Sequence, residues 1–310
     1  MTPARRKTLE RIKRGGAQKS RFSLKKLLVI LLLIVGLFML FRSQTRVWNG
    51  RDKVSIAVFD KDRVVVSTFD PEADEITNVF IPGETQVDSS RELGTFRIKN
   101  IWRLGENEKI GGVLLSETVT KNFKFPVGSW SEDLALAYSS GEAAQILGAT
   151  FKPFSTNLGI GDKLALAAFS LRVKNTNRVE IDLAETGYLK AAKLIDGEAG
   201  YLVSGRPPQQ VASIFADSQI ASGSVRISII NETGEASDPE AVAQILEVIG
   251  GKVSSLVKGE IQDYDCTVLG DVKDAAYKIA KVLGCDFQAK APEGNFDLEV
   301  KLGKRFAERF

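Results

Sequence analysis

The side chains that this sequence offers for chemistry are carboxylates, guanidinium and ammonium groups, phenols and two thiols. The sequence has no histidine, which excludes a Ser-His-Asp or Cys-His nucleophile, a histidine metal ligand and a histidine general base. Any catalysis would therefore use Asp, Glu, Arg, Lys or Tyr, or a hard cation such as Mg²⁺ held by carboxylates.

The two cysteines, Cys266 and Cys285, are 19 residues apart and do not match a zinc-binding pattern. Each opens a predicted strand, and a helix is predicted between them at Asp271–Leu283. A right-handed crossover brings the starts of both strands to the same end of a sheet. The sequence therefore predicts a disulfide, provided that the compartment is oxidising. The alternative is two buried free thiols.

A run of fifteen residues without a charge, Leu27–Phe41, predicts a transmembrane anchor. A helix of this length spans about 22 Å, less than the roughly 30 Å of a bilayer's hydrocarbon core. Extension back to Phe22 supplies the missing length if Lys25 and Lys26 reach the headgroups along their aliphatic stems. The alternatives are a cleaved signal peptide and a buried core helix. The residues after the run are large and charged, unlike those at a cleavage site.

Charge is distributed unevenly around this run. Residues 1–42 contain eleven Lys or Arg and one acid, whereas the remainder contains 31 basic and 38 acidic residues. Positive residues concentrate on the cytoplasmic side of membrane helices. We therefore expect a single-pass plasma-membrane protein with residues 1–26 as a cytoplasmic tail and its bulk outside the cytoplasm. The acidic remainder argues against nucleic acid as a partner.

Two domains of mixed α/β structure are expected after a linker at residues 43–52. The first spans residues 53–220, and its strands and helices predict a layered α/β fold. Asp70–Asp74 is typical of the turn of a hairpin. The expected strands are Val54–Val58, Arg63–Phe69, Glu75–Ile81 and Val179–Leu183, and the expected helices cover Asn107–Phe123, the residues after a capping box at Ser129 and Glu132, the residues after a cap at Asp162, and Pro208–Ile220.

The second domain is a small α/β unit at residues 224–303, followed by a tail at 304–310. Asp238 before Pro239 is typical of a helix start, and Gly250-Gly251 of a helix end. The remaining expected elements are strands at Ser224–Ile230, Val253–Val257, Cys266–Leu269, Cys285–Gln288 and Phe296–Leu302, and the helix at Asp271–Leu283.

Two motifs in this second domain are similar to those of the LytR C-terminal domain. One is a strand followed by Asn231-Glu232-Thr233-Gly234, and the other is the ending Asp-x-x-Val-x-Leu-Gly from Asp297 to Gly303. The resemblance covers residues 224–303. Such domains commonly follow an N-in membrane anchor and a LytR-CpsA-Psr domain, whose active members transfer glycopolymers from a lipid pyrophosphate carrier to peptidoglycan.

Residues 53–220 resemble a LytR-CpsA-Psr domain in outline. A strand ending at Asp60, a hairpin, and then Ile81-Pro82-Gly83-Glu84-Thr85 follow the order that leads to the family's Ile-Pro-Arg-Asp-Thr motif. Gly83 stands where the family has Arg, and Glu84 where it has Asp. The later Arg-rich stretch that the family uses on phosphates has no recognisable counterpart around residues 164–178. The resemblance therefore implies a degenerate domain.

Four residues are candidates for a rearranged catalytic site: Asp60, Asp62, Arg63 and Glu84. A pyrophosphate leaving group requires a guanidinium fork and magnesium held by carboxylates. The alternative is that these residues are solvated charges at strand ends and in turns.

Two functions follow from these features. The first is a non-catalytic envelope protein without a cofactor, which sits in the lipid bilayer and binds peptidoglycan, wall glycopolymer or envelope proteins. The second is a magnesium-dependent phosphotransferase that moves a glycopolymer from a polyprenyl-pyrophosphate carrier to peptidoglycan. The departures at Gly83 and Glu84 favour the first.

The charge asymmetry predicts the side of the membrane on which the bulk of the chain lies. A phosphatase reporter fused after Phe310 should be active because it requires export, and a fluorescent protein that matures only in the cytoplasm should stay dark at the same position. Paired activity and fluorescence measurements check this. A fluorescent fusion without phosphatase activity would contradict the predicted localisation.

Overall fold

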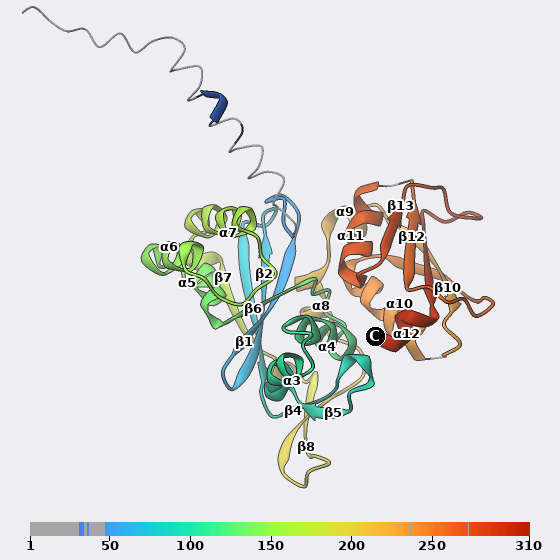
Figure 1. Ribbon diagram of the computed structural model, residues 1–310, viewed down its shortest axis with the longest axis horizontal. Helices are drawn as coiled ribbons and strands as arrows, with labels where there is room; N and C mark the ends of the chain where they lie inside the picture. Colours follow the sequence, from blue (N-terminus) through green and yellow to red (C-terminus); the bar gives the residue numbers. More distant parts are fainter. Residues whose placement is uncertain (1–30, 34–35, 37–46, 236, 272) are drawn as a thin grey trace, which may run out of the picture. The chain divides into compact units, whose positions relative to one another are not determined.

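The computed structural model describes residues 31–33, 36, 47–235, 237–271 and 273–310 (Figure 1). Most of the predicted anchor, Leu27–Phe41, lies outside these residues. Among the helices that the structure does describe, none has the length and apolar character needed to cross a membrane. Residues Gln44–Phe310 form one compact unit, and the description below concerns that unit.

The first sheet, sheet A, has the strand order β6-β1-β2-β3-β7. Strands β1, β2 and β3 form an antiparallel meander, and β6 and β7 add to its two edges in parallel to their neighbours. Asp70 pairs with Glu75 across the predicted hairpin turn, which confirms that turn. The strands are β1 (Val54–Asp60), β2 (Arg63–Asp70), β3 (Glu75–Pro82), β6 (Ser129–Glu132) and β7 (Arg178–Asp182).

Sheet A is covered on both faces, because successive side chains of a strand point to opposite sides. Val64 and Val66 of β2 join one buried cluster, which includes residues of α3 and α4. Val65 joins another, which includes residues of the α5–α7 region. The helices are α3 (Ile101–Asn107), α4 (Val113–Phe123), α5 (Ala137–Ser140), α6 (Ala143–Phe151) and α7 (Ile160–Arg172). Figure 1 shows the two helical groups on either side of the sheet.

A smaller sheet, sheet B, extends from the end of sheet A at which β3 finishes. Its order is β5-β4-β9-β8, in which β4 and β9 are parallel and the outer pairs are antiparallel. Its strands are β4 (Thr85–Asp88), β5 (Thr95–Arg97), β8 (Leu189–Lys193) and β9 (Ala199–Val203). The sequence does not predict this sheet, since its strands are short. Two short helices, α8 (Gln209–Phe215) and α9 (Ser218–Ser222), then lead to the C-terminal part.

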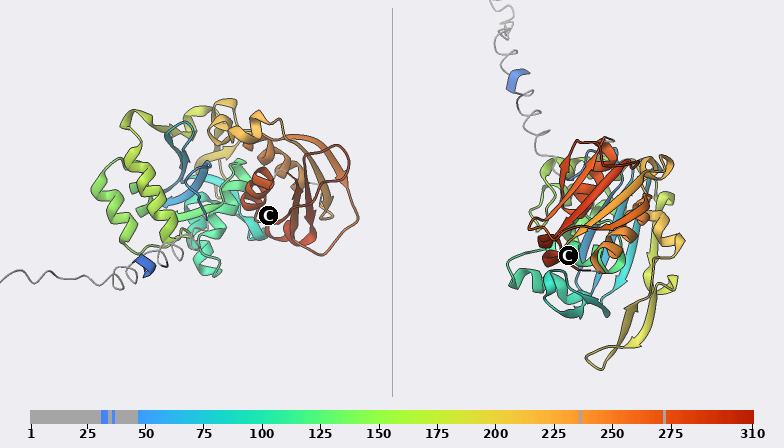
Figure 2. Two further views of the ribbon diagram at one scale, coloured as in Figure 1. Left: turned by 90° about the horizontal axis from the view of Figure 1, so that it is seen from above. Right: turned by 90° about the vertical axis from the view of Figure 1, so that its right-hand side faces the viewer.

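The third sheet, sheet C, confirms the strands and helices predicted for residues 224–303. Its order is β11-β10-β14-β12-β13, with β12 and β14 antiparallel and the other neighbours parallel. Its elements are β10 (Arg226–Glu232), α10 (Ser237–Ile249), β11 (Lys252–Lys258), β12 (Cys266–Gly270), α11 (Lys273–Leu283), β13 (Asp286–Gln288), β14 (Leu298–Gly303) and a further helix, α12 (Lys304–Arg309). Helices α10 and α11 contribute to one buried cluster with alternate residues of the strands. Figure 2 shows the strands of this sheet from a second direction.

The predicted helix over Asn107–Phe123 begins too early. Helix α3 ends at Asn107 and α4 begins only at Val113. Between them Gly111 has a φ of +65°, and a Cβ on Gly112 would lie 2.2 Å from the ring of Trp130. The chain therefore turns at this glycine pair instead of continuing as a helix.

One further predicted helix start is wrong, and one predicted helix is divided in two. Ser129 and Glu132 do not form a capping box but belong to β6, and the Glu132 carboxylate accepts a hydrogen bond from the Ser155 N–H. The helix predicted over Pro208–Ile220 breaks at Asp217, whose carboxylate accepts the N–H groups of Gln219 and Ile220 and so caps a separate helix, α9. At the first place the chain pairs with β1 as a strand, whereas at the second the short Asp217 side chain binds the backbone locally and starts a new helix. Helix α10 starts at Ser237, one residue before its expected cap.

The overall class is mixed α/β, as predicted. The boundary between the predicted domains 53–220 and 224–303 stays a prediction, and both ranges lie within the one compact unit.

The disulfide between Cys266 and Cys285 is present, with a Cα to Cα distance of 4.9 Å. Cys266 is the first residue of β12, and Cys285 directly precedes β13. The two strands are parallel neighbours, connected through α11. The crossover predicted from the sequence thus brings the two strand starts together.

Reduction of this bridge should lower the free energy of unfolding by about 3 kcal/mol, because the bridge closes a loop of about twenty residues in the unfolded chain. Urea denaturation of the compact unit, Gln44–Phe310, with and without reductant measures the difference. Thiol titration of the unreduced, denatured protein should find no free thiol. Two reactive thiols in that titration would contradict the bridge, and a Cys266→Ser, Cys285→Ser double variant should match the reduced protein.

Candidate functional site

Three of the residues predicted for catalysis gather at one end of sheet A. Asp60 and Arg63 close the β1-β2 hairpin and pair with each other in the strand register, with Asp62 in the turn between them. Arg63 also pairs with Pro82, the last residue of β3, so Gly83 and Glu84 follow at the same end. The structure therefore brings the four candidates to one edge of the fold.

The charges at this edge are paired with one another. The Arg63 guanidinium donates to the Asp60 carboxylate at 2.8 Å and lies 4.4 Å from the centre of the Phe80 ring. The Glu84 carboxylate forms ion pairs with Arg97 and Lys99, and Arg97 in turn pairs with Asp196 at 2.8 Å. The edge thus holds two separate ion-paired groups.

The pKa of Glu84 is lowered, chiefly by its hydrogen bond to the Lys99 ammonium, with a further contribution from Arg97. Glu84 is therefore held as a carboxylate, and its two cations already neutralise it. Among the residues that the structure describes, no three acids, cysteines or histidines come close enough to form a metal site. The described residues thus do not fit a magnesium ion held by Asp60, Asp62 and Glu84.

Gly83 stands where the resembled motif has its arginine, and the fold leaves no room there for a side chain. A Cβ on this residue would lie 1.8 Å from the backbone oxygen of Asp62 and 3.0 Å from the Cβ of Lys99. The β1-β2 turn therefore packs directly on the backbone of residue 83. Any larger residue requires the turn to move.

A different feature, a cleft of about 380 Å³, opens between the 47–52 segment with the start of β1 on one side and α11 on the other. Its walls include the apolar residues Val54, Pro126, Phe215 and Ile220. Its polar lining comes from Asp52, Asp217, Asp274, Lys53, Lys278 and Lys281. The volume of the cleft and its mixture of apolar and charged lining residues are typical of a site that binds a small ligand.

The wall formed by residues 47–52 is held by one buried carboxylate. Asp162 accepts hydrogen bonds from the backbone N–H groups of Val47 at 3.3 Å and Trp48 at 3.0 Å. Its other oxygen accepts the Gly159 N–H at 2.8 Å at the start of α7. Trp48 is buried against Phe69 and Phe169 and so belongs to the core.

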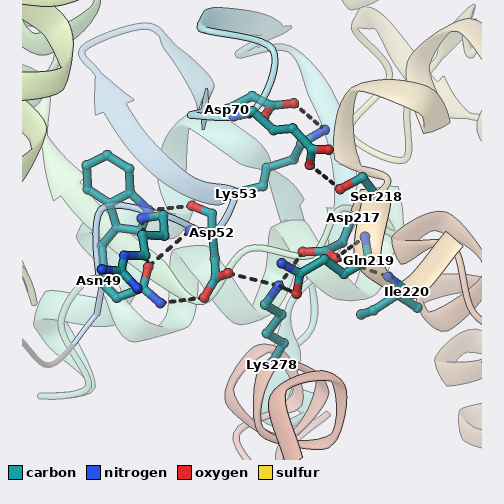
Figure 3. Close-up of polar contacts among 12 residues, drawn as sticks. Asn49, Asp52, Lys53, Asp70, Asp217, Ser218, Gln219, Ile220 and Lys278 are labelled. Carbon is teal, nitrogen blue, oxygen red and sulfur yellow. Dashed lines mark hydrogen bonds and ion pairs between the residues drawn. The ribbon is translucent and has the colours of Figure 1, made fainter. Parts of the chain in front are cut away.

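Asn49 shapes the next turn and so places Asp52 at the cleft. Its side-chain oxygen accepts the N–H groups of Arg51 and Asp52, and the Trp48 indole N–H donates to the Asp52 carbonyl. Part of the predicted linker at 43–52 is thus ordered against the folded unit. The polar contacts around Asp52 appear in Figure 3.

Lys278 of α11 joins two acids from distant parts of the chain. Its ammonium lies 3.0 Å from the Asp52 carboxylate and 2.9 Å from that of Asp217 (Figure 3). Burial alone would lower the pKa of Lys278, but the bonds to Asp217 and Asp52 outweigh it and raise that pKa. The bridge therefore connects the 47–52 segment, the start of α9 and α11 in one charged network.

Two further lysines border the cleft. Lys53 pairs with Asp70 at 2.9 Å and donates to the Ile214 carbonyl at 2.9 Å. The Lys281 ammonium donates to the Val47 carbonyl, and burial lowers the pKa of Lys281. Tyr277 lines the cleft and is 56% exposed, and its ring packs edge-to-face against Phe287 with the ring centroids 6.3 Å apart. The cleft thus combines charged groups that can form hydrogen bonds with one partly exposed aromatic ring.

The sequence gives no signal for this cleft. Asp52, Asp217 and Lys278 come from three segments far apart in the chain, and no motif links them. The same is true of the pairing of Arg97 with Glu84 and Asp196. Only a prediction of long-range contacts would have found either group.

No protein-family model matches this chain, and no curated protein sequence is similar to it. Solved structures to which it is similar include proteins of the LytR-CPS2A-Psr family. Lin1025 from Listeria innocua is 13% identical, with 50% of this chain and 92% of that chain covered and a TM-score of 0.37. Bacillus subtilis TagV is 12% identical, with 51% and 92% covered and a TM-score of 0.38. TagT, solved with bound octaprenyl pyrophosphate lipid, is 16% identical, with 50% and 85% covered and a TM-score of 0.36. At these identities and scores no site residue is transferred to this chain.

Replacement of Lys278 should destabilise the protein, because it leaves the Asp217 carboxylate, whose side chain is 11% exposed, without its cation. Lys278→Met should cost about 2 kcal/mol of unfolding free energy at neutral pH, as measured by urea denaturation.

The pH dependence provides a control. Because the folded-state pKa of Lys278 is raised, its stabilisation is complete below the ordinary value of 10.5 and is lost as the pH rises through the higher folded value. The stability difference between wild type and Lys278→Met should therefore shrink above that pH. A difference that stays constant in alkali would show that the ion pair is not its source.

Proposed function

We propose that this chain is a membrane-anchored, non-catalytic protein of the cell envelope that binds wall glycopolymer in the cleft bordered by Lys278 and Tyr277. The predicted anchor at Leu27–Phe41 and the charge asymmetry around it support the location. Peptidoglycan is the polymer nearest to such a protein, and envelope proteins are the other class of partner. No cofactor and no nucleic acid take part in this function.

The single observation that carries the non-catalytic assignment is the closed position at Gly83. Transfer from a pyrophosphate carrier requires guanidinium groups that stabilise the charge on the departing phosphates. At residue 83 even a Cβ would meet the Asp62 carbonyl oxygen. The nearby Arg63 and Arg97 are already paired with Asp60, Glu84 and Asp196.

The cleft has the composition that a hydroxyl-rich, charged polymer requires. Its lining includes three aspartates and three lysines; Lys278 is paired with Asp52 and Asp217, but a carboxylate or an ammonium group in such a pair can still form a further hydrogen bond with a hydroxyl group. The exposed Tyr277 ring adds a flat apolar surface of the kind that packs against sugar rings. Its volume accommodates a short piece of a polymer rather than a whole chain.

The alternative is a phosphotransferase that acts on a polyprenyl-pyrophosphate-linked glycopolymer. It is favoured by the similar structures, of which one holds octaprenyl pyrophosphate lipid and another is TagT bound to LIIa-WTA. In this chain Asp60, Arg63 and Glu84 would have to leave their present partners, so that the carboxylates of Asp60, Asp62 and Glu84 could hold magnesium and Arg63 could contact the pyrophosphate.

The enzyme alternative is tested by release of lipid phosphate from a polyprenyl-pyrophosphate glycopolymer in the presence of magnesium. We expect none from the full chain in detergent, because loss of an Arg to phosphate contact costs a few kcal/mol at the transition state and each 1.36 kcal/mol is about tenfold in rate. Gly83→Arg should not restore activity, since its side chain collides with the β1-β2 turn. Turnover by the wild type that Asp60→Ala or Arg63→Ala abolishes would establish the enzyme instead.

Polymer binding is tested by co-sedimentation of the full chain with purified cell-wall fragments. Tyr277→Ala should weaken binding about fivefold, the effect of removing one aromatic contact worth about 1 kcal/mol. Asp274→Asn should weaken binding as well, and the double variant should bind more weakly than either single variant. Ile195→Ser, at a residue that is 80% exposed on the β8-β9 turn, is the matched surface control and should bind as the wild type does. Equal binding by all variants would contradict the cleft as the polymer site.

A further inference from the structure

Helix α6 is apolar on nearly all sides. Its sequence, Ala-Ala-Gln-Ile-Leu-Gly-Ala-Thr-Phe, contains Gln145 and Thr150 as its polar residues. Ile146, Ala149 and Thr150 face inward and are buried. A surface helix of a soluble protein normally carries polar residues on its outer face. The outer face of α6 therefore requires an explanation.

That outer face is a continuous apolar stripe. The stripe consists of four residues that are spaced by three, one and three positions and therefore lie on one side of the helix: Ala144, Leu147, Gly148 and Phe151. Leu147 is 50% exposed and Phe151 is 71% exposed, and a Cβ on Gly148 would meet no atom within 4 Å. The residues that the structure describes therefore leave Leu147 and Phe151 largely uncovered.

The place of α6 in the fold connects it to the point where the folded unit starts. Ile146 and Ala149 of α6 belong to the same buried cluster as Val47 and Trp48. Asp162 at the start of α7 binds the backbone of those two residues. Figure 1 shows α6 on the far side of sheet A from the C-terminal sheet.

The chain before Val47 limits how far this region can be from a membrane. Five residues separate Phe41, the end of the predicted anchor, from Val47. Fully extended, they span about 20 Å. The headgroup layer occupies several Å of that span. With the proposed anchor in the bilayer, Val47, which belongs to the same buried cluster as Ile146 and Ala149 of α6, would therefore lie within a short distance of the bilayer surface.

We propose that α6 docks on the bilayer that holds the predicted anchor, with Leu147 and Phe151 buried in the interfacial region and the exposed Lys152 among the lipid phosphates. Amphipathic helices bind membranes through an aromatic and aliphatic face flanked by basic residues. The docking rests on the proposed anchor and fixes the orientation of the folded unit on the membrane, which an anchor alone does not.

The test uses the full chain in proteoliposomes that contain phosphatidylglycerol and a phosphatidylcholine brominated high on its acyl chains. Phe151→Trp places a fluorescent probe on the stripe, and Leu147→Trp is a second probe in case the first impairs folding. Ile195→Trp places the same probe on an exposed turn remote from α6. The wild type, with its native tryptophans, gives the baseline for each.

We expect the emission of the Phe151→Trp and Leu147→Trp probes to shift to shorter wavelength and to be mostly lost with brominated lipid, while that of Ile195→Trp stays unquenched. Probes on α6 that are quenched no more than Ile195→Trp, in a chain that floats with the vesicles, would overturn the docking and leave the anchor intact. A chain that does not float with the vesicles would contradict the anchor and the docking together.

Discussion

The carboxylate of Asp162 is the constraint on which the arrangement of this protein depends. It is fully buried and accepts three backbone N–H groups, from Val47, Trp48 and Gly159. Hydrogen bonds to an ionised acceptor are among the strong ones in proteins, and a buried charge without them is very costly. One side chain thus fixes both the start of α7 and the start of the folded unit. The Asn49 turn follows from that point and carries Asp52 to Lys278.

The cleft lies between the buried cluster of sheet A and that of sheet C, which are in contact but remain two separate hydrophobic cores. The cluster around sheet C is formed by residues from Ile220 onward, whereas Val248 of α10 packs into the cluster beneath sheet A instead. The Asp217 N–H donates to the carbonyl of Ile249 at 2.7 Å, which ties α9 to the end of α10. Between these contacts the opposing surfaces carry charges that water or a ligand must satisfy. The Lys278 bridge keeps that polar gap at a fixed width.

The sequence predicts what depends on local pattern. Alternation of Val54, Ile56 and Val58 specifies β1, Pro71 and its acidic neighbours specify the turn from β2 into β3, and the crossover rule places Cys266 beside Cys285. Prediction from the sequence fails where one residue type fits more than one local structure. Ser129 and Glu132 fit a helix cap and an edge strand equally well, and the strand prevails because β1 supplies its backbone partners.

The candidate catalytic residues illustrate a second limit. Their gathering at one end of sheet A follows from strand order, which a sequence can suggest. Their ion pairs cannot be predicted in this way, because Arg97 and Asp196 are separated by about a hundred residues and meet only through the pairing of β4 with β9. Likewise the sequence shows that Gly83 lacks a side chain, but the contact with the Asp62 backbone that forbids one is tertiary.

The strand order of sheet C has a consequence for the route by which the protein folds. Strand β14 follows every other strand of that sheet in the chain, yet it lies at the centre, between β10 and β12. Until it is inserted, β10 with β11 and β12 with β13 are two separate parallel pairs with open inner edges. Contacts between β10 and β14 span about seventy residues, and such long-range pairing is slow to form. The C-terminal sheet is therefore expected to close in a single late step after synthesis of β14, and its half-formed pairs are the species most exposed to aggregation.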